Sequence, residues 1–333
     1  MRLKVGKIEN SLLEKIVFKN LPKNENPLIL EKPSIGKDCA SIDFGQNIAI
    51  LSTDPITATA EKIGTLAVNI TANDIATKGI KPIGIMLTVL LPIDTTDKSL
   101  KKIMLDVKKA ADKINIAIIG GHTEVTAAVT IPVITTTGIG IRGKDICPVS
   151  SPVSIFYNAD ILVSKYIGLE GTAIIANEKA AELNLPNSDI RKAKNLIDEI
   201  SVVKEGIIAD KIGVMTMHDI TEGGVLGAAW EMSKANNIGI KIYEDRIPIL
   251  AISQKIANHF KIDLLKLISS GSMLILSDKK KTKKIMEECG KENILITKIG
   301  ESMKNKKVLL INKKGEEKEI EEPKSDEIYK ILK

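Results

Sequence analysis

Residues 215–232 read MTMHDITEGGVLGAAWEM and combine a short predicted strand, a polar turn and a helix that opens on two glycines. The polar residues of the turn and the two glycines are His218, Asp219, Thr221, Glu222, Gly223 and Gly224. A helix that starts there presents free backbone N–H groups and the positive end of its dipole, so the stretch can receive an anion. A simpler interpretation is that Thr221 or Asp219 caps the helix, and a capping residue can still contact a ligand.

Strands and helices alternate throughout the second half of the chain. The helices have roughly 10 to 15 residues, a length typical of α/β units. Strands are expected at residues 161–164, 214–217, 239–242, 273–276, 293–299 and 307–311. This alternation predicts an α/β domain in which helices layer on a sheet.

The first half of the chain mixes a β-hairpin with helices and further strands. The hairpin strands end near Asp43 and Ser52, and a helix over 63–78 stops at Gly79 and Pro82. The remaining elements are a helix over 12–18, a strand over 83–91, a helix over 97–115, a strand over 116–120 and a β-rich run over 129–141. This half therefore predicts a mixed sheet with helices.

The length of 333 residues indicates two domains, because one domain usually holds roughly 100 to 200 residues. Pro148 and Pro152, in the stretch GKDICPVSSPV, mark the expected junction. We expect an N-terminal α+β domain over 1–152 and a C-terminal α/β domain over 153–333. With 44% hydrophobic and 27% charged residues, the composition is that of a folded globular protein.

Composition and termini exclude several classes of protein. The longest uncharged run, 125–141, is shorter than the ~20 apolar residues of a membrane span. The first residues, MRLKVGKIEN, lack the apolar region of a signal peptide, so we expect a cytoplasmic protein. The odd set of Cys39, Cys147 and Cys289, without CxxC spacing, predicts free thiols.

The charged residues do not indicate a nucleic-acid partner. The net charge of +6 arises from 48 basic and 42 acidic residues that are spread along the chain, and aromatic residues make up 3%. A nucleic-acid reader usually clusters arginine and stacking rings. We therefore expect no nucleic-acid partner.

One glycine-rich motif is excluded by its context. GIGIRGKD, residues 138–145, satisfies GxGxxG through Gly138, Gly140 and Gly143 and nearly satisfies the P-loop pattern. Both nucleotide motifs require a helix directly after the glycines, whereas this chain continues into ICPVSSPV.

Three aspartates in apolar or small-residue settings are better candidates for a site. They are Asp38 in GKDCASID, Asp54 in LSTDP and Asp74 in TANDIATKG. Taken singly, each fits a turn, a cap or, for Asp74, a surface pair with Lys78. Gathered in one cleft, carboxylates repel by roughly 4 kcal/mol per pair at 4 Å, and a divalent cation such as Mg²⁺ removes that penalty.

In the segment IIGGHTEVT, residues 118–126, five candidate residues follow a predicted strand whose apolar pattern is that of a buried one. Its candidate residues are Gly120, Gly121, His122, Thr123 and Glu124. Paired glycines let a ligand approach the backbone, beside the polar atoms of the histidine and glutamate. The alternative is a β-turn that contains a hydrogen-bonded histidine.

The order of these motifs resembles one known family. GxDxA, STD, NDIA, GGHTEVT, HDxTEGG and SSG follow one another as in the aminoimidazole ribonucleotide (AIR) synthase superfamily, also called PurM-like. The resemblance runs from about Gly6 to Gly300 and is strongest to the HypE-like, AIR synthase related branch. It implies a two-domain protein whose N-terminal sheets pair into a shared β-barrel in a homodimer, with ATP along the dimer groove.

The resemblance also implies roles for individual residues. Asp38, Asp54 and Asp74 correspond to magnesium and phosphate carboxylates, and Asp219 to an acidic residue of the second domain that approaches the metal. The implied catalytic residues are Asp74, His218 and Asp219. The implied cofactor contacts are Lys7, Asp38, Asp54, Asn73, Gly120, Gly121, His122, Thr123, Glu124, Thr221, Gly223 and Gly224.

The sequence departs from HypE at a position that bears on the reaction. HypE carries a terminal cysteine that receives a carbamoyl group, whereas residues 325–333 here read SDEIYKILK. We expect an ATP- and Mg²⁺-dependent enzyme that phosphorylates or activates an oxygen of a small amide, acid or phosphate-bearing substrate, and a maturation protein is a further candidate partner. The alternative is a nucleotide-binding regulatory or assembly protein without turnover.

Overall fold

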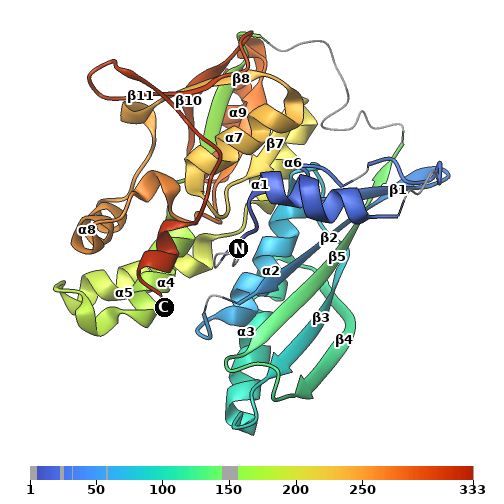
Figure 1. Cartoon of the computed structure of the whole chain (residues 1–333). Helices are drawn as coiled ribbons and strands as arrows, with labels where there is room; N and C mark the ends of the chain where they lie inside the picture. The colour runs from blue at the N-terminus through green and yellow to red at the C-terminus, as the bar shows by residue number, and fades with distance from the viewer. Residues whose placement is uncertain (1–5, 23–25, 32, 58, 145–156, 333) are drawn as a thin grey trace.

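Two mixed sheets organise the chain (Figure 1), whose computed structural model describes residues 6–22, 26–31, 33–57, 59–144 and 157–332. The N-terminal sheet contains β1 (Ala40–Phe44), β2 (Asn47–Ile56), β3 (Gly84–Leu91), β4 (Ala117–Val125) and β5 (Val133–Gly143). The C-terminal sheet contains β6 (Asp160–Ser164), β7 (Thr216–Asp219), β8 (Gly239–Tyr243), β9 (Met273–Ser277), β10 (Ile296–Met303), β11 (Val308–Ile311) and β12 (Glu317–Glu319). The expected two-domain α and β architecture is confirmed.

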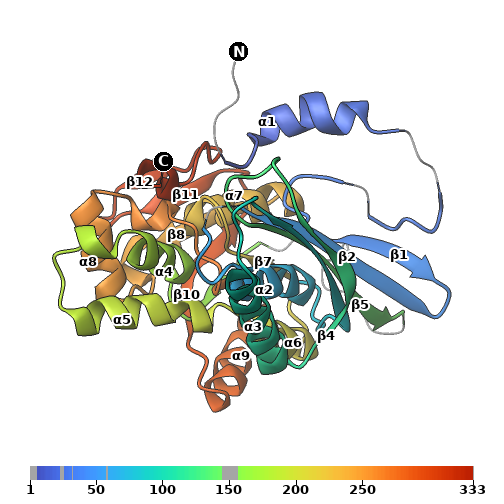
Figure 2. The same ribbon diagram turned by 90° about the horizontal axis from the view of Figure 1, so that it is seen from below.

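The N-terminal sheet has the strand order β1-β2-β5-β3-β4, and only the β3–β4 pair is parallel. Helix α2 (Ile63–Ala76) covers one face, with α3 (Asp97–Ile114) packed against it (Figure 2). Because α2 also packs against the second domain, it is buried on nearly every side. This double contact explains why the apolar and small residues of α2 are spread around the helix rather than gathered on one face.

The C-terminal sheet has the order β12-β11-β8-β10-β6-β9-β7, and every pair but β8–β11 is antiparallel. Its helices are α4 (Leu169–Glu178), α5 (Asn187–Asn195), α6 (Val203–Ile212), α7 (Gly224–Asn236), α8 (Ala251–Phe260) and α9 (Lys279–Lys291). Helix α7 packs against β7, β8 and β11, which places the N-terminus of α7 beside the end of β7.

Several expectations are met closely and others need correction. The glycines of GIGIRGKD lie inside β5, and a Cβ on Gly138 would lie 2.7 Å from Thr71 on α2, so this glycine allows the helix to pack closely.

The helix expected over 12–18 is only α1 (Asn10–Leu12), continued by a π turn and a 3₁₀ turn. The expected boundary between 152 and 153 lies outside the described residues.

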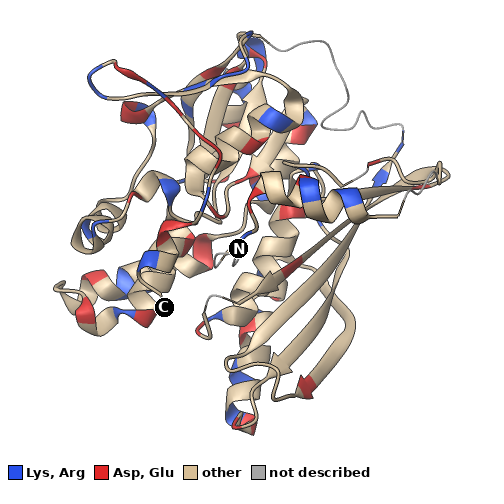
Figure 3. Cartoon of the chain, viewed as in Figure 1, with Lys and Arg blue, Asp and Glu red and all other residues tan. Residues whose placement is uncertain are grey.

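Charged residues are distributed over both domains, while the N-terminal sheet is almost free of them (Figure 3). This distribution agrees with the diffuse charge in the sequence. No helix within the described ranges combines the length and apolar character needed to cross a membrane.

Candidate functional site

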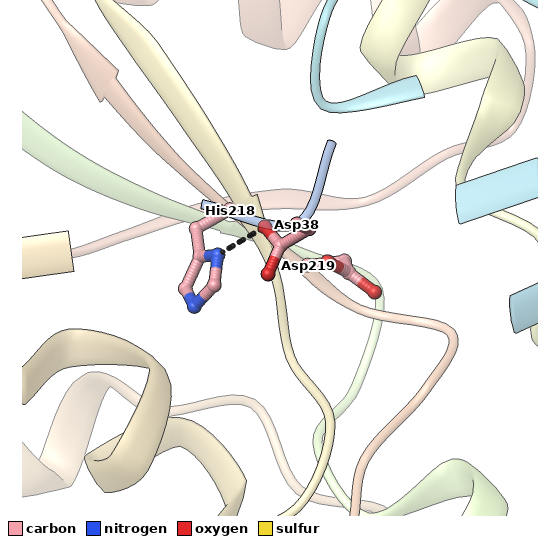
Figure 4. Close-up of side chains that lie close together, drawn as sticks. All are labelled: Asp38, His218 and Asp219. Atoms are coloured by element: carbon pink, nitrogen blue, oxygen red, sulfur yellow. Dashed lines mark hydrogen bonds and ion pairs between the residues drawn. The ribbon is translucent and has the colours of Figure 1, made fainter. Parts of the chain in front are cut away.

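Four aspartates from four separate segments meet where the two domains touch. Asp38 lies just before β1, Asp54 on β2, Asp74 on α2 and Asp219 at the end of β7. One oxygen each of Asp38 and Asp219 lies within 4.8 Å of the other and of a His218 ring nitrogen (Figure 4). The structure therefore gathers all three aspartates of the N-terminal half with the acidic residue of the second domain.

Asp74 and Asp54 are linked through a serine. The Ser52 hydroxyl donates to Asp74 Oδ2 and lies 3.3 Å from Asp54 Oδ2. Burial, followed by the charges of Asp219, Asp54 and Asp38, raises the pKa of Asp74 well above its usual value. Asp74 is 6% exposed and Lys78 pairs with Glu31 instead, so the alternative of a surface Asp74–Lys78 pair is wrong.

His218 lies between two carboxylates. Its Nδ1 is 2.9 Å from Asp38 Oδ2 and its Nε2 is 3.1 Å from Glu231 Oε2. Burial alone would lower the pKa of His218, but Asp38 and Glu231 outweigh burial and raise it well above its usual value. Both carboxylates thus favour the protonated ring, which can donate to each of them.

Lys7 completes this network from the N-terminal segment. Its Nζ lies 2.9 Å from Glu231 Oε1, and its backbone N–H donates to Glu222. Although burial would raise the pKa of Asp38, the charges of His218 and Lys7 lower it to about 2. Asp38 is therefore ionised, and its side chain keeps 23% of its surface exposed, so it remains reachable from solvent.

Asp219 has the least favourable surroundings of the four aspartates. It is 2% exposed, and its Oδ2 has no hydrogen-bond partner among the described residues. Burial and the charge of Asp38 raise the pKa of Asp219 to about 7. Buried polar atoms are normally paired, so an orphaned carboxylate oxygen beside three other aspartates fits a bound cation. The residues present therefore suit the Mg²⁺ that the family resemblance implies.

The N-terminus of α7 is occupied by the chain itself. Asp326, from the C-terminal segment, accepts a hydrogen bond of 2.7 Å from the Gly223 N–H through its Oδ2. Neither Thr221 nor Asp219 caps the helix with its side chain, which corrects the capping interpretation. Gly224 approaches another backbone, since a Cβ there would lie 2.5 Å from the Leu265 carbonyl oxygen.

The segment Gly120–Glu124 lies within the exposed edge strand β4, so the alternative interpretation as a β-turn is wrong. A Cβ on Gly121 would lie 1.9 Å from the Leu87 carbonyl oxygen, so that glycine serves the pairing of β4 with β3. His122 Nε2 lies 3.1 Å from Glu124 Oε2, with Thr123 between them in sequence. Within the chain, this segment does not join the aspartate cluster.

Asn73 and the cysteines have structural surroundings. The Asn73 amide donates to the Ile200 carbonyl and accepts from the Val202 N–H, so both of its polar groups join the two domains. Cys39 and Cys289 are free and buried, as expected, and burial raises the pKa of each thiol. Cys147 lies outside the described residues.

Two residues of the network were missed by the sequence argument. Ser52 lies in the STD motif but was considered only as the end of a strand. Glu231 is the sole charged residue in the α7 stretch 223–233, GGVLGAAWEMS, and such an isolated acid in an apolar helix is a usable signal of a buried partner.

Comparison with known families agrees with this geometry. The description "AIR synthase related protein, N-terminal domain" matches residues 36–142, and "AIR synthase related protein, C-terminal domain" matches residues 159–311. The chain belongs to the AIR synthase related family. The two matched ranges contain all four aspartates of the cluster and His218.

Two curated relatives of this AIR synthase related protein cover most of its length. A protein of Methanocaldococcus jannaschii that is assigned to hydrogenase expression and formation is 31% identical over 291 residues, 85% of this chain and 83% of the relative. The carbamoyl dehydratase HypE of Escherichia coli K12 is 26% identical over 330 residues, 92% of this chain and 91% of HypE.

Solved structures share the fold. The crystal structure of a HypE–HypF complex matches with a TM-score of 0.76 at 25% identity, covering 93% of this chain and 99% of that chain. A structure of HypE in complex with ATP matches with a TM-score of 0.68 at 19% identity, covering 96% of each chain. These matches confirm the PurM-like architecture.

Proposed function

We propose that the protein is an ATP- and Mg²⁺-dependent enzyme that transfers the γ-phosphoryl group to an oxygen of a small amide, acid or phosphate-bearing substrate. The observation that supports this function is the convergence of Asp38, Asp54, Asp74 and Asp219, with an orphaned oxygen on Asp219. The HypE relatives, one of them solved with ATP, are consistent with nucleotide use.

Each residue of the cluster has a task in this proposal. Asp38, Asp54, Asp74 and Asp219 would hold Mg²⁺, which neutralises phosphate charge in phosphoryl transfer when it is bound. Asp74 and Asp219, whose pKa values are raised, gain most from a cation because it removes their mutual repulsion. His218 and Lys7 keep positive charge beside Asp38, where phosphate oxygens approach.

We further propose that the protein is a homodimer that pairs through its N-terminal sheet. The sheet face opposite α2 exposes uncharged side chains, with Met86 and Ile141 each 49% exposed. Among the described strands β4 pairs only with β3, so its other side is an open edge. Ile119 on β4 is 55% exposed, and such edges invite pairing with another chain. A second copy would also cover the exposed segment Gly120–Glu124. These residues remain candidate nucleotide contacts in the dimer.

The dimer proposal is tested by light scattering on wild type and two methionine variants. The wild type is expected at twice the chain mass of 36.2 kDa. Met86→Lys places a charge on the open sheet face and should give the monomer. Met286→Lys is the matched control, because Met286 is 40% exposed on α9 and should leave the dimer intact. A wild-type monomer at micromolar concentration contradicts the dimer.

We also propose a cellular location and a protein partner for the enzyme. We place the enzyme in the cytoplasm and expect a maturation protein as a partner, because a related HypE forms a complex with HypF.

Nucleotide binding and turnover are measured separately. Calorimetry should show tighter ATP binding with Mg²⁺ than in chelator, because the aspartates repel a bare triphosphate. ADP release should then appear with small amides or carboxylic acids as acceptors. Equal ATP affinity in chelator contradicts the metal assignment, and Mg²⁺-dependent binding without ADP release favours the nucleotide-binding assembly protein.

A further inference from the structure

The aspartate cluster contains a mixed nitrogen and oxygen ligand set on one side. One oxygen each of Asp38 and Asp219 and a His218 ring nitrogen lie within 4.8 Å of one another. His218 Nδ1 and Asp38 Oδ2 are 2.9 Å apart (Figure 4). Two ligand atoms at about 2.1 Å from one ion, set at right angles, lie roughly 3 Å apart. The pair therefore has the separation of neighbouring ligands of one ion.

We propose that Asp38, His218 and Asp219 form a binding position for a divalent first-row transition metal, with Nδ1 of His218 as its nitrogen ligand. The metal displaces the proton that Nδ1 shares with Asp38 in the metal-free chain, and this proton is released to solvent. Glu231 is the outer carboxylate that orients the ring. This position goes beyond the proposed ATP function, because it concerns a different class of cation and needs no nucleotide.

The balance of charge around the position favours a cation. Lys7 and His218 offset the charges of Glu231 and Asp38. In the described part of the chain, no Lys, Arg or His forms an ion pair with Asp54, Asp74 or Asp219. Buried carboxylates in excess are costly unless they are paired or coordinate a metal.

Asp219 adds a second observation, beside the His218–Asp38 spacing, that points to a bound cation. Its side chain is almost completely buried, at 2% exposed, and its Oδ2 finds no partner among the described residues. The carboxylate lies beside Asp38 in Figure 4. A purely structural Lys7–Glu231–His218–Asp38 network would leave this oxygen unexplained.

The surroundings of His218 match those of metal-binding histidines. Such a histidine usually donates its second ring N–H to a carboxylate, which fixes its orientation. Here Nε2 lies 3.1 Å from Glu231 Oε2, and Glu231 is itself held by Lys7 at 2.9 Å. Nδ1 is thereby directed at Asp38. Imidazole suits transition metals, whereas Mg²⁺ prefers an all-oxygen set such as Asp54 and Asp74 can offer.

The direct test is pulsed electron paramagnetic resonance of Mn²⁺ bound to the tag-free, metal-stripped full chain without nucleotide. The expected result is one tightly bound Mn²⁺ with modulation from an imidazole nitrogen. His218→Asn should abolish this modulation, since it retains an amide near Asp38 but removes the ring. His259→Asn is the matched control, because His259 is exposed on α8 and should leave the signal unchanged.

Affinity gives a second readout by calorimetry with Co²⁺ and Mg²⁺. The wild type should bind Co²⁺ at least tenfold more tightly than Mg²⁺, and His218→Asn should remove most of that preference. Glu231→Gln should weaken Co²⁺ binding on the order of 10- to 100-fold, the usual effect of losing an outer carboxylate. Near-ultraviolet circular dichroism monitors the fold of each variant.

Absence of nitrogen modulation in the wild type overturns the proposal, even if no variant folds. Modulation that persists in folded His218→Asn also overturns it. Nitrogen-coupled Mn²⁺ in a protein that binds no ATP supports the metal position while the proposed function fails. ATP and Mg²⁺ binding without a nitrogen-coupled metal overturns the metal position and leaves the proposed function standing, so the two failures are distinguishable.

Discussion

Two histidine–carboxylate pairs of nearly equal length lie in very different surroundings. His218 and Asp38 are 2.9 Å apart, with 5% and 23% of their side chains exposed, whereas His122 and Glu124 are 3.1 Å apart, with 63% and 47% exposed. Contact length is similar in both pairs, so it does not distinguish them. Burial does, because water screens the exposed pair and leaves the buried pair to its protein neighbours.

The pairs also differ in how they arise. His122 and Glu124 are two residues apart on one strand, so their side chains share a face without any help from the fold. His218 and Asp38 are 180 positions apart and come from different domains. A site built by convergence depends on every element that positions it, and we expect it to be more sensitive to substitution.

The largest expected effect is the loss of stability in His218→Ala. Removing the ring leaves Asp38 without its closest counter-charge and Glu231 with Lys7 alone, which typically costs about 3 to 5 kcal/mol. Urea unfolding in metal-free buffer measures the change in free energy of unfolding. A loss below about 1 kcal/mol would mean that the buried His218–Asp38 pair contributes no more to stability than an exposed ion pair does.

Asp74→Asn should abolish most nucleotide turnover while the fold is retained. The change keeps volume and hydrogen bonding with Ser52 but removes a charge of the cluster. The loss of one metal carboxylate should reduce the rate by on the order of 10² to 10³. ADP release at saturating Mg²⁺ is the assay, with circular dichroism as the folding control. A mutant with at least half the wild-type rate contradicts the role of Asp74.

Burial should also give the second domain a pH dependence that the exposed strand lacks. Glu170 is 2% exposed, and burial raises its pKa from 4.5 to about 7. The Glu170 carboxyl therefore binds a proton more tightly in the folded protein than in the unfolded chain. Its stabilising contribution is therefore complete below about pH 4.5 and is lost as pH rises towards 7, by up to about 3 kcal/mol.

Glu170→Gln tests this effect, because the amide is neutral at every pH. Unfolding free energies measured from pH 4.5 to 7.5 should fall less steeply with pH in the variant than in the wild type. Parallel profiles for the two proteins would show that Glu170 does not hold its proton in the fold.

The smallest expected effect is that of His122→Ala. An exposed ion pair contributes little, so the change in stability should be within about 0.5 kcal/mol. The measurement is made in the monomeric Met86→Lys background, where β4 remains exposed. A much larger loss in the wild-type background than in Met86→Lys would show that a second copy covers His122 and converts the exposed pair into a buried one.

Predictions from sequence were accurate where a local pattern was sufficient. The helix expected over 97–115 is α3 (Asp97–Ile114), because its apolar residues repeat with the helical period. The strand expected over 273–276 is β9 (Met273–Ser277), as a short apolar run between turn residues. The pairing directions of the strands were open, since a parallel and an antiparallel neighbour bury the same residues.

Errors arose where a distant segment decided the local structure. The glycines at 120 and 121 resemble a ligand turn, yet Gly121 is needed for the approach of β4 to the Leu87 carbonyl. The N-terminus of α7 was interpreted as an anion site or, alternatively, as capped by Thr221 or Asp219, whereas Asp326, about 100 positions later, occupies it. The residue pattern around Gly121 does not predict the contact with Leu87, and the pattern around α7 does not predict the contact with Asp326.

The sequence by itself determined the two-domain α and β architecture, the main helices and strands, and the identity of the aspartates, because period, turn residues and motif order are local properties. Only the tertiary structure decided that Asp38, Asp54, Asp74 and Asp219 share one buried site and that Glu231 and Lys7 support His218. The physical reason is that burial and the distances between charges depend on how remote segments pack, and these two quantities set the pKa and ligand chemistry of every group in the cluster.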